Sequence, residues 1–309
     1  MPIEERATRL QWLDIAKGIT IILMVMGHSA IPNVLGRFIY AFHMPLFFIS
    51  SGITTKYSSL PDFLKKKSKN LLLPFIIYSV IVLALEAFLL HISYEEEFVN
   101  WLKMGWLGMA LWFVPVLYIS LIVCWCINKI NRKWIRMLAT SSLPIVGVLL
   151  NNHSIWLPWN LSTVPYASFF IIIGNWLKPY CGVIDKLAQK WYIYVVLFAI
   201  TFLISHFWRL DMAWNKCMPI IPLTIGALSG TVLVFCVSKL INYKSSFLTG
   251  FFTIIGQETF AILAFSQIII RYINEYLTMP FYVKYVLLAI SLMLIVLIKN
   301  VCSKRMKAK

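Results

Sequence analysis

Long apolar stretches separated by short polar segments follow one another along almost the whole chain. An apolar run of about twenty residues is long enough for an α-helix to cross a bilayer. The pattern predicts about ten such helices, at 11–31, 35–54, 71–92, 107–127, 137–150, 162–177, 191–208, 219–240, 251–273 and 281–299. We therefore expect an all-α fold, a polytopic membrane helix bundle, with residues 1–309 forming a single membrane domain.

Two of these runs are short, and each contains a proline: Pro144 in 137–150 and Pro165 in 162–177. Proline removes a helical hydrogen bond, so both spans are expected to be kinked or partly re-entrant. The composition agrees with a membrane protein, because 60% of the residues are hydrophobic and only 13% are charged, against about a quarter charged in a soluble domain. The six cysteines are scattered, so neither a disulfide framework nor a metal site is expected.

Lysine and arginine are distributed unevenly over the segments between the spans. When alternate segments are grouped, one group is strongly basic, whereas the other holds only Lys103, Arg209 and Lys216. Because basic segments stay on the cytoplasmic side of a membrane, both termini and residues 56–69 are expected to face the cytoplasm. These segments account for the formal net charge of +16, so we predict a plasma or inner membrane protein with no nucleic-acid partner.

The first span carries three polar side chains that hydrocarbon disfavours, Asp14, Lys17 and His28. Lys17 and His28 are eleven residues apart, which is close to a whole number of helical turns, and Asp14 lies near the same line. The three groups therefore share one stripe, as expected where a helix faces the bundle interior or a wet cavity. For Lys17 alone, a snorkelling side chain at the cytoplasmic interface remains an alternative.

A second histidine, His43, lies in the next span, within FHMPLFFISSG at residues 42–52. That helix runs back toward the cytoplasm, and a rise of about 1.5 Å per residue places His28 and His43 at similar depth in the outer half of the membrane. Imidazole is the usual general base near neutral pH, so the pair indicates a catalytic site. Two neutral histidines bonded to each other or to backbone carbonyls are the structural alternative.

Four lysines follow that helix on the predicted cytoplasmic side: Lys65, Lys66, Lys67 and Lys69. Orientation in the membrane alone could explain this charge. A cluster of ammonium groups at the inner mouth of the bundle would also suit a phosphorylated ligand. The segment therefore has two interpretations, a topology signal or a phosphate-binding site.

Together these segments resemble the acyltransferase-3 family of integral membrane acyltransferases, in particular its fucose 4-O-acetylase-like branch. The family's first-helix frame, LDxxRG…GH, is matched by Leu13, Asp14, Lys17, Gly18, Gly27 and His28. Its FHMPLFFxxSG motif is matched by residues 42–48, 51 and 52, and its LWFLP segment by Leu111, Trp112, Phe113 and Pro115. LPWNL, at residues 157–161, resembles a loop of the same branch.

The resemblance implies transfer of an acyl group, usually acetyl from acetyl-CoA, to a hydroxyl group of a carbohydrate. Lys65, Lys66, Lys67 and Lys69 would then hold the CoA phosphates, and Lys17 would meet the thioester arm. His28 or His43 would take the proton from the sugar hydroxyl, either in direct transfer or through an acyl-histidine relay. The residues expected to bind the acceptor are Asp14, Trp112, Trp156, Trp159 and Glu258. For Trp156 and Trp159 the alternative is a place in the aromatic belt at the membrane interface. Glu86 and Arg271 are further charged candidates within spans, and for them, as for Glu258, a structural ion pair is the alternative.

Three departures from the family pattern matter for the site. The usual arginine of the first helix is Lys17, which keeps the charge but loses the bidentate fork. Ser266 stands where histidine is common, and Ser162 stands where this branch often has aspartate. The last two departures concern a third histidine and a late acidic contributor, and they leave the N-terminal site intact.

Two other kinds of protein remain as alternatives. One is a transporter or exporter of a polysaccharide or a lipid-linked sugar, although such proteins often contain paired repeats that this sequence lacks. The other is a structural partner of a glycan assembly complex, which would need neither two buried histidines nor a lysine-rich mouth. Membrane acyl transfer is the function that the sequence favours.

Overall fold

The computed structural model describes residues 10–90, 95, 99, 110–155 and 157–307, and these form helices joined by short connections. No strand occurs among the described residues, so the predicted all-helical class is confirmed. The single-domain organisation stays a prediction.

The first half of the chain contains the following helices in order: α1 (Gln11–Gly27), α2 (Asn33–Tyr40), α3 (His43–Thr54), α4 (Leu60–Lys67), the π-helical segment η1 (Ser68–Leu72), α5 (Leu73–Leu90), the 3₁₀ turn η2 (Ala110–Trp112), α7 (Phe113–Asn128) and α8 (Lys133–Asn152). The second half contains η3 (Pro158–Thr163), α9 (Val164–Leu177), η4 (Lys178–Tyr180), α10 (Cys181–Ala188), α11 (Trp191–Phe207), η5 (Met212–Trp214), α12 (Ile220–Lys244), α13 (Ser246–Gln257), α14 (Thr259–Tyr276) and α15 (Phe281–Lys307).

The predicted spans correspond to helices in the part of the chain that the structure describes. Seven helical segments are long and apolar enough to cross a membrane, or eight if the bent pair α13–α14 counts as one span. Both α1 and α11 have 17 residues, slightly fewer than a typical span. The polytopic architecture is therefore confirmed, while the count of ten stays a prediction.

One predicted span, 251–273, is wrong as a single helix. It is broken at Glu258, where α13 and α14 meet at an angle of 75°. Packing explains the direction of α13, because this helix lies directly against α1: a Cβ atom on Gly256 would overlap the carbonyl oxygen of Asp14. The carboxylate at the break pairs with Lys299 of α15 at 2.6 Å, which offsets the cost of a charge in a span.

A close crossing of α3 with α9 fixes the helix that begins at His43. A Cβ atom on Gly52 of α3 would overlap the carbonyl oxygen of Ile171, and one on Gly174 of α9 would overlap that of Ile49. Small residues allow membrane helices to approach until their backbones touch. The glycine of the FHMPLFFISSG segment therefore sets the distance between these two helices.

Helix α1 lies at the centre of the bundle, because it contributes to both apolar clusters. Its first turns, with Trp12 and Leu13, pack with α3, α7, α9 and α12. Its last turns, with Ile21 and Met24, pack with α5, α14 and α15. Polar groups on α1 are therefore surrounded by other helices.

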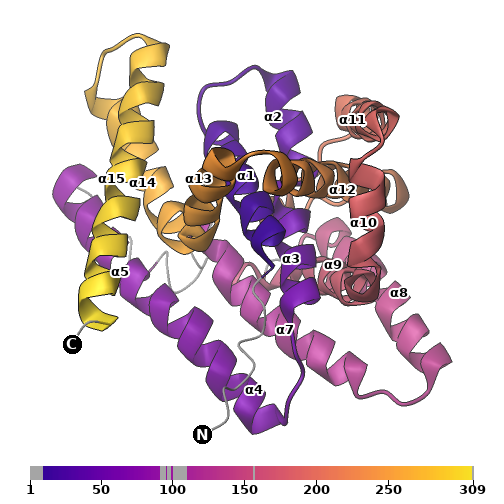
Figure 1. The fold of residues 1–309 in the computed structure, drawn as a ribbon. Coiled ribbons are helices and arrows are strands. Elements are labelled where there is room, and N and C mark those ends of the chain that lie inside the picture. Colours follow the sequence, from indigo (N-terminus) through magenta and orange to yellow (C-terminus); the bar gives the residue numbers. More distant parts are fainter. Residues whose placement is uncertain (1–9, 91–94, 96–98, 100–109, 156, 308–309) are drawn as a thin grey trace, which may run out of the picture.

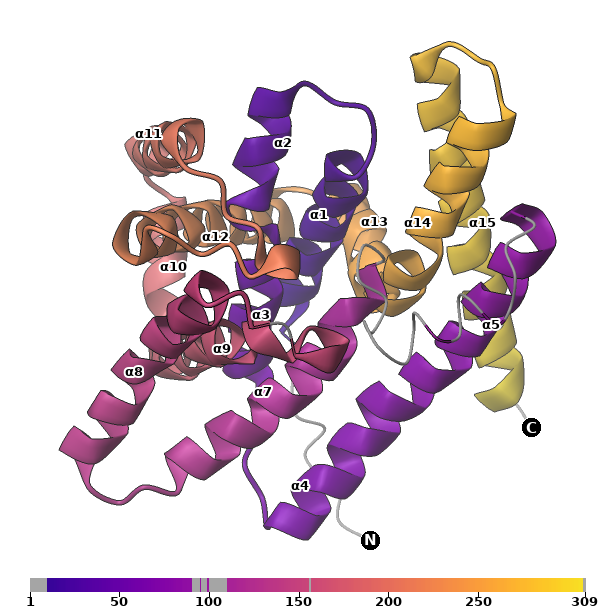
Figure 2. The ribbon, with the colours of Figure 1, turned by 180° about the vertical axis from the view of Figure 1, so that it is seen from behind.

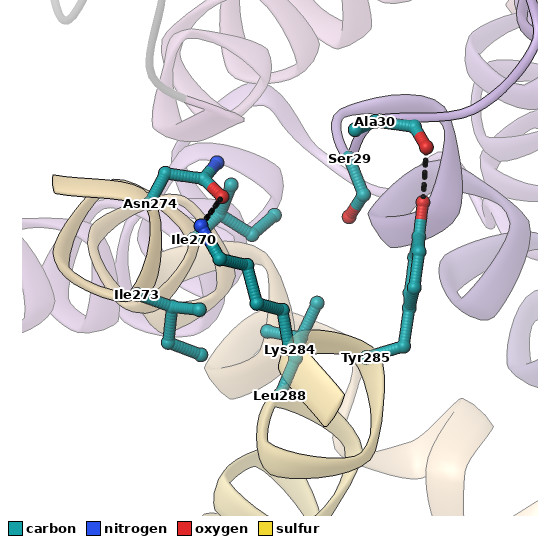
Figure 3. Close-up of a pocket in the computed structure, with 8 residues that line it drawn as sticks. All are labelled: Ser29, Ala30, Ile270, Ile273, Asn274, Lys284, Tyr285 and Leu288. Atoms are coloured by element: carbon teal, nitrogen blue, oxygen red, sulfur yellow. Dashed lines mark hydrogen bonds between the residues drawn. The ribbon is translucent and has the colours of Figure 1, made fainter. Parts of the chain in front are cut away.

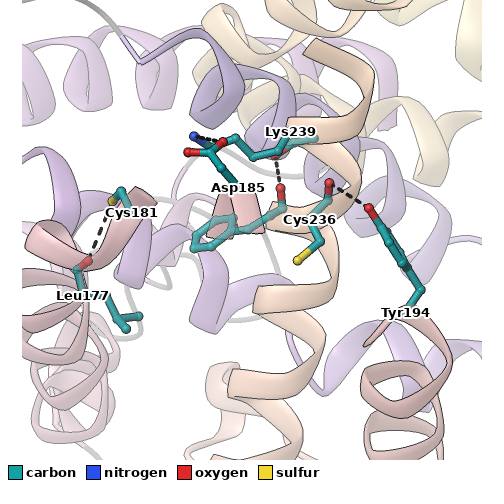
Figure 4. Close-up of polar contacts among 8 residues, drawn as sticks. Leu177, Cys181, Asp185, Tyr194, Cys236 and Lys239 are labelled. Carbon is teal, nitrogen blue, oxygen red and sulfur yellow. Dashed lines mark hydrogen bonds and ion pairs between the residues drawn. The ribbon is translucent and has the colours of Figure 1, made fainter. Parts of the chain in front are cut away.

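The connections are divided between two ends of the molecule. Figures 1 and 2 show α4 and the α7–α8 turn at one end, and the α1–α2 connection and the α14–α15 turn at the opposite end. Polar contacts join α10, α11 and α12 (Figure 4): Lys239 pairs with Asp185 at 2.7 Å, and the Tyr194 hydroxyl donates to the Cys236 carbonyl at 3.4 Å. The Lys239 ammonium also lies 4.7 Å from the centre of the Trp12 ring, which connects α12 to the start of α1.

Candidate active site

A small pocket lies where the end of α1 meets the start of α3. His28 and His43 line this pocket together with Tyr40, Trp112 and Asp211. The remaining wall is largely apolar and consists of Met24, Met44, Ala110, Met212, Ala213 and Leu263. The structure therefore brings together both histidines and one tryptophan of the predicted site. The walls leave about 20 Å³ between them, which is room for about one water molecule.

The imidazole of His28 is positioned by the next helix and by α15. Its Nδ1 atom lies 3.2 Å from the hydroxyl of Tyr40 in α2. Two residues further on, the carbonyl of Ala30 accepts a hydrogen bond of 2.9 Å from Tyr285 of α15, beside Lys284 and Asn274 (Figure 3). The turn that carries His28 is therefore fixed from two sides.

The imidazole of His43 is almost completely enclosed, with 3% of the residue exposed. Its Nδ1 atom lies 3.0 Å from the carbonyl oxygen of Ile39. The ring of Tyr40 lies edge-on to it, with 4.9 Å between ring centres, and contacts the His28 ring in the same way at 5.7 Å. Tyr40 thus contacts both histidines.

An ion pair from the segment between α11 and α12 completes the pocket. Arg209 and Asp211 pair at 3.2 Å, and the Arg209 guanidinium lies 4.9 Å from the centre of the Tyr40 ring. Burial raises the pKa of the Asp211 carboxyl, and Arg209 counteracts that shift. The hydroxyl of Thr163 donates to the Met212 carbonyl at 2.7 Å, which fixes this segment to the residues before α9.

At the other end of α3, two lysines converge on one residue. Lys67 of α4 donates to the Thr55 hydroxyl at 3.4 Å, and Lys178 of η4 donates to the Thr55 carbonyl at 3.2 Å. Of the four lysines in the predicted cluster, only Lys67 is partly buried, because Lys65, Lys66 and Lys69 are exposed. Lys178 lies far from this cluster in sequence and joins it only in the fold.

Several predicted site residues lie elsewhere. Lys17 faces Asp14 with 3.9 Å between Nζ and Oδ1, toward the end of α1 remote from the pocket. Glu258 pairs with Lys299, and Trp159 packs against the ring of Phe75 at 5.7 Å. The histidine pocket is lined by none of the predicted residues Asp14, Lys17, Trp159 and Glu258. Trp156 lies outside the described residues.

Two other charged residues within the helices, Glu86 and Arg271, pair with each other at 2.9 Å. Ser162, at the position where aspartate was expected, has a local role. Its hydroxyl accepts from the Leu157 N–H and donates to the Ile155 carbonyl, each at 2.8 Å. This serine therefore shapes the loop before α9.

Tyr40, Asp211 and Arg209 are site residues that the sequence interpretation missed. Tyr40 lies three residues before His43, which is a usable signal, but tyrosine is common in apolar helices. Arg209 is one of the few basic residues in the segments that are predicted to lie outside, and Asp211 lies two residues from it. A charged pair in a segment otherwise poor in lysine and arginine could have indicated this contact.

The fold and the pocket define a polytopic helical membrane protein with a buried polar site. The model of the acyltransferase domain family, acyltransferase 3, matches residues 10–301, so the chain belongs to this family of membrane acyltransferases. No curated protein and no solved structure matches the chain. The assignment to the fucose 4-O-acetylase-like branch stays a prediction.

Proposed function

We propose that this acyltransferase is an O-acyltransferase that moves an acetyl group from cytoplasmic acetyl-CoA to a hydroxyl group of a cell-surface carbohydrate. The observation that supports the proposal best is the shared pocket of His28, His43 and Trp112 inside a membrane bundle. Imidazole can accept the proton of an attacking hydroxyl, and an indole ring offers a flat apolar surface on which a sugar can pack.

The donor requires a second site, because the phosphates of acetyl-CoA are separated from its thioester by a long flexible arm. Lys67 and Lys178 are the best candidates for the phosphate contacts, since both extend toward Thr55 at the end of α3. The helix has 12 residues, so about 18 Å separate Thr55 from the histidine end. A donor that spans this distance would pass beside α1, which carries Lys17.

An assay of acetyl transfer to glycans by the purified protein tests the proposal directly. Protein in lipid nanodiscs is supplied with radiolabelled acetyl-CoA and a panel of polysaccharides and lipid-linked glycans. We expect label in a glycan with the wild-type protein and little label when both His28 and His43 are replaced by alanine. Movement of glycan across sealed vesicles without any acetylation would instead support a transporter.

The proposal also requires a defined orientation in a plasma or inner membrane. Both termini and the Lys65–Lys69 segment should face the cytoplasm, as the uneven distribution of lysine indicates. Lys66 is exposed, so a single cysteine at this position in a cysteine-free background can be labelled with a membrane-impermeant maleimide. Labelling only after the cells are opened is the expected result, and labelling of intact cells would reverse the orientation.

A further inference from the structure

We infer that the two histidines perform different tasks: His43 accepts the proton of the attacking hydroxyl, and His28 donates a hydrogen bond to the reacting carbonyl oxygen. Tyr40 is the positioning residue that establishes this difference. The inference rests on the proposed function and deepens it, because two neutral imidazoles would otherwise be interchangeable.

The tautomer of His43 follows from its backbone contact. Nδ1 lies 3.0 Å from the carbonyl oxygen of Ile39, and a carbonyl oxygen can only accept a hydrogen bond. Nδ1 of the neutral ring therefore carries the proton, and Nε2 keeps its lone pair. Since the ring lines the pocket, Nε2 is the atom that can accept a proton there.

The tautomer of His28 follows from Tyr40. Among the described residues, the only hydrogen-bond partner of the Tyr40 hydroxyl is His28 Nδ1, at 3.2 Å. If Nδ1 carried the proton, the phenolic hydrogen would have no acceptor among the residues that the structure describes, which is costly in a part-buried site. With the phenol as donor, Nδ1 accepts and Nε2 of His28 carries the hydrogen.

Arg209 and Asp211 hold the Tyr40 ring in place. Its guanidinium lies 4.9 Å from the centre of the Tyr40 ring. The charges of Arg209 and Asp211 act on the Tyr40 phenol in opposite directions, so this ion pair positions the ring without setting the direction of the bond. Asp211 holds the guanidinium through the pair at 3.2 Å.

These two tautomers together can carry out the transfer step. The acceptor oxygen attacks the thioester carbon while its proton passes to Nε2 of His43, and the carbonyl oxygen becomes an oxyanion that accepts the hydrogen bond from Nε2–H of His28. The carbon–sulfur bond then breaks, the ester carbonyl re-forms, and the proton on His43 passes to the departing CoA sulfur. Both histidines end in their starting tautomers.

The tautomers can be measured without any acyl transfer. Protein labelled with ¹⁵N-histidine contains five histidines, and the spectra of His28→Gln and His43→Gln protein assign the two signals. We expect Nε2–H for His28 and Nδ1–H for His43. Tyr40→Phe should remove the preference at His28 and leave His43 unchanged, whereas Tyr194→Phe, the matched loss of a hydroxyl near α12, should change neither.

Turnover separates the two tasks, because a glutamine side chain can donate a hydrogen bond but cannot act as a base. With radiolabelled acetyl-CoA and the acceptor that the glycan panel identifies, His43→Gln should lose about as much turnover as His43→Ala, roughly 10²–10⁴-fold. His28→Ala should lose about 10²–10³-fold, and His28→Gln should recover at least tenfold of that loss. Tyr40→Phe should lower turnover with little change in the KM for acetyl-CoA.

Failure of this inference and failure of the proposed function give different results. If His28 carries Nδ1–H, if both histidines have the same tautomer, or if glutamine rescues position 43 rather than 28, the division of tasks is wrong. If the wild-type protein transfers no acetyl group to any glycan, the proposed function fails, and the spectra alone decide whether the tautomers differ.

Discussion

The two ends of helix α3 differ in how deeply they are enclosed and in the charged groups around them. At its start, His43 is enclosed, and its ring is fixed by a carbonyl and by the edge of an aromatic ring. At its end, Thr55 is approached by Lys67 and Lys178, cations on elements that lie far apart in sequence. The first end is enclosed and holds two imidazoles beside the pair of Arg209 and Asp211, whereas the second holds two ammonium groups near the surface.

This difference separates two requirements of acyl transfer. Proton transfer depends on atoms held within a few tenths of an ångström, which burial and fixed hydrogen bonds provide. Binding of a phosphorylated donor depends on charge, which acts over longer distances and tolerates movement. We therefore expect substitutions at the histidine end to change turnover and substitutions at the lysine end to change donor binding.

The largest effect should come from the histidine end. Replacing both His28 and His43 with alanine should lower turnover by about 10²–10⁴-fold, because the base and its partner are removed. The KM for acetyl-CoA should change little. His206→Ala is the matched control, since His206 is exposed on α11. Equal losses in the control and the double variant would show that the pocket has no special role.

The next effect concerns the crossing that connects the two ends. Gly52→Ala introduces a Cβ atom that overlaps the backbone of α9, so the helices must separate. Overpacking of this kind typically costs about 1–3 kcal/mol, which should appear as a lower midpoint in thermal unfolding of the detergent-solubilised protein. Gly182→Ala has nothing within 4 Å of the new atom and should leave the midpoint unchanged. If both variants unfold at the wild-type temperature, the close crossing is not required.

A smaller effect is expected at the lysine end. Lys67→Ala and Lys178→Ala should each raise the KM for acetyl-CoA by about two- to fivefold, the range for partly exposed charge pairs, with nearly constant turnover. Exposed Lys65 provides the control, because Lys65→Ala removes the same charge without the Thr55 contact. A turnover defect with an unchanged KM would assign Lys67 to the helix packing instead of the donor.

The smallest effect is expected for a conservative change in α1. Lys17→Arg keeps the charge opposite Asp14 and provides the residue that the family usually has, so activity should stay within about twofold. Lys17→Ala removes the ammonium group that faces Asp14, a carboxylate that is only 4% exposed. This change should lower both yield and activity. Measuring yield and turnover together distinguishes these results, and a fully active Lys17→Ala protein would remove Lys17 from the transfer path.

The lengths of the apolar runs were sufficient to predict the architecture, because a helix that crosses a membrane must satisfy its own backbone hydrogen bonds and present apolar side chains to lipid. It could not predict the break at Glu258, since the pairing with Lys299 and the close contact with α1 involve distant parts of the chain. A local pattern contains no information about such contacts. The same limit explains why an apolar run interrupted by one acid was interpreted as a continuous helix.

The candidate site was predictable where its residues lie in short motifs. His28, His43 and Trp112 each belong to a recognisable segment, and the fold brings them into one pocket. Asp211 and Lys178 could not be found in this way, because their contacts with the site come from distant segments. Depth along a helix, which suggested that the two histidines are close, also gave no information about which ring nitrogen carries hydrogen.

The small volume of the histidine pocket bears on the hydrolysis of the acyl donor by water. Room for about one water molecule is too little for a sugar, so the carbohydrate acceptor of the proposed reaction would have to displace the walls to enter. Water is the competing nucleophile for any activated thioester, and a pocket of this size cannot hold the thioester and a water molecule at the same time, which limits hydrolysis. The tight packing around His28 and His43 would therefore conserve acetyl-CoA while no glycan is bound.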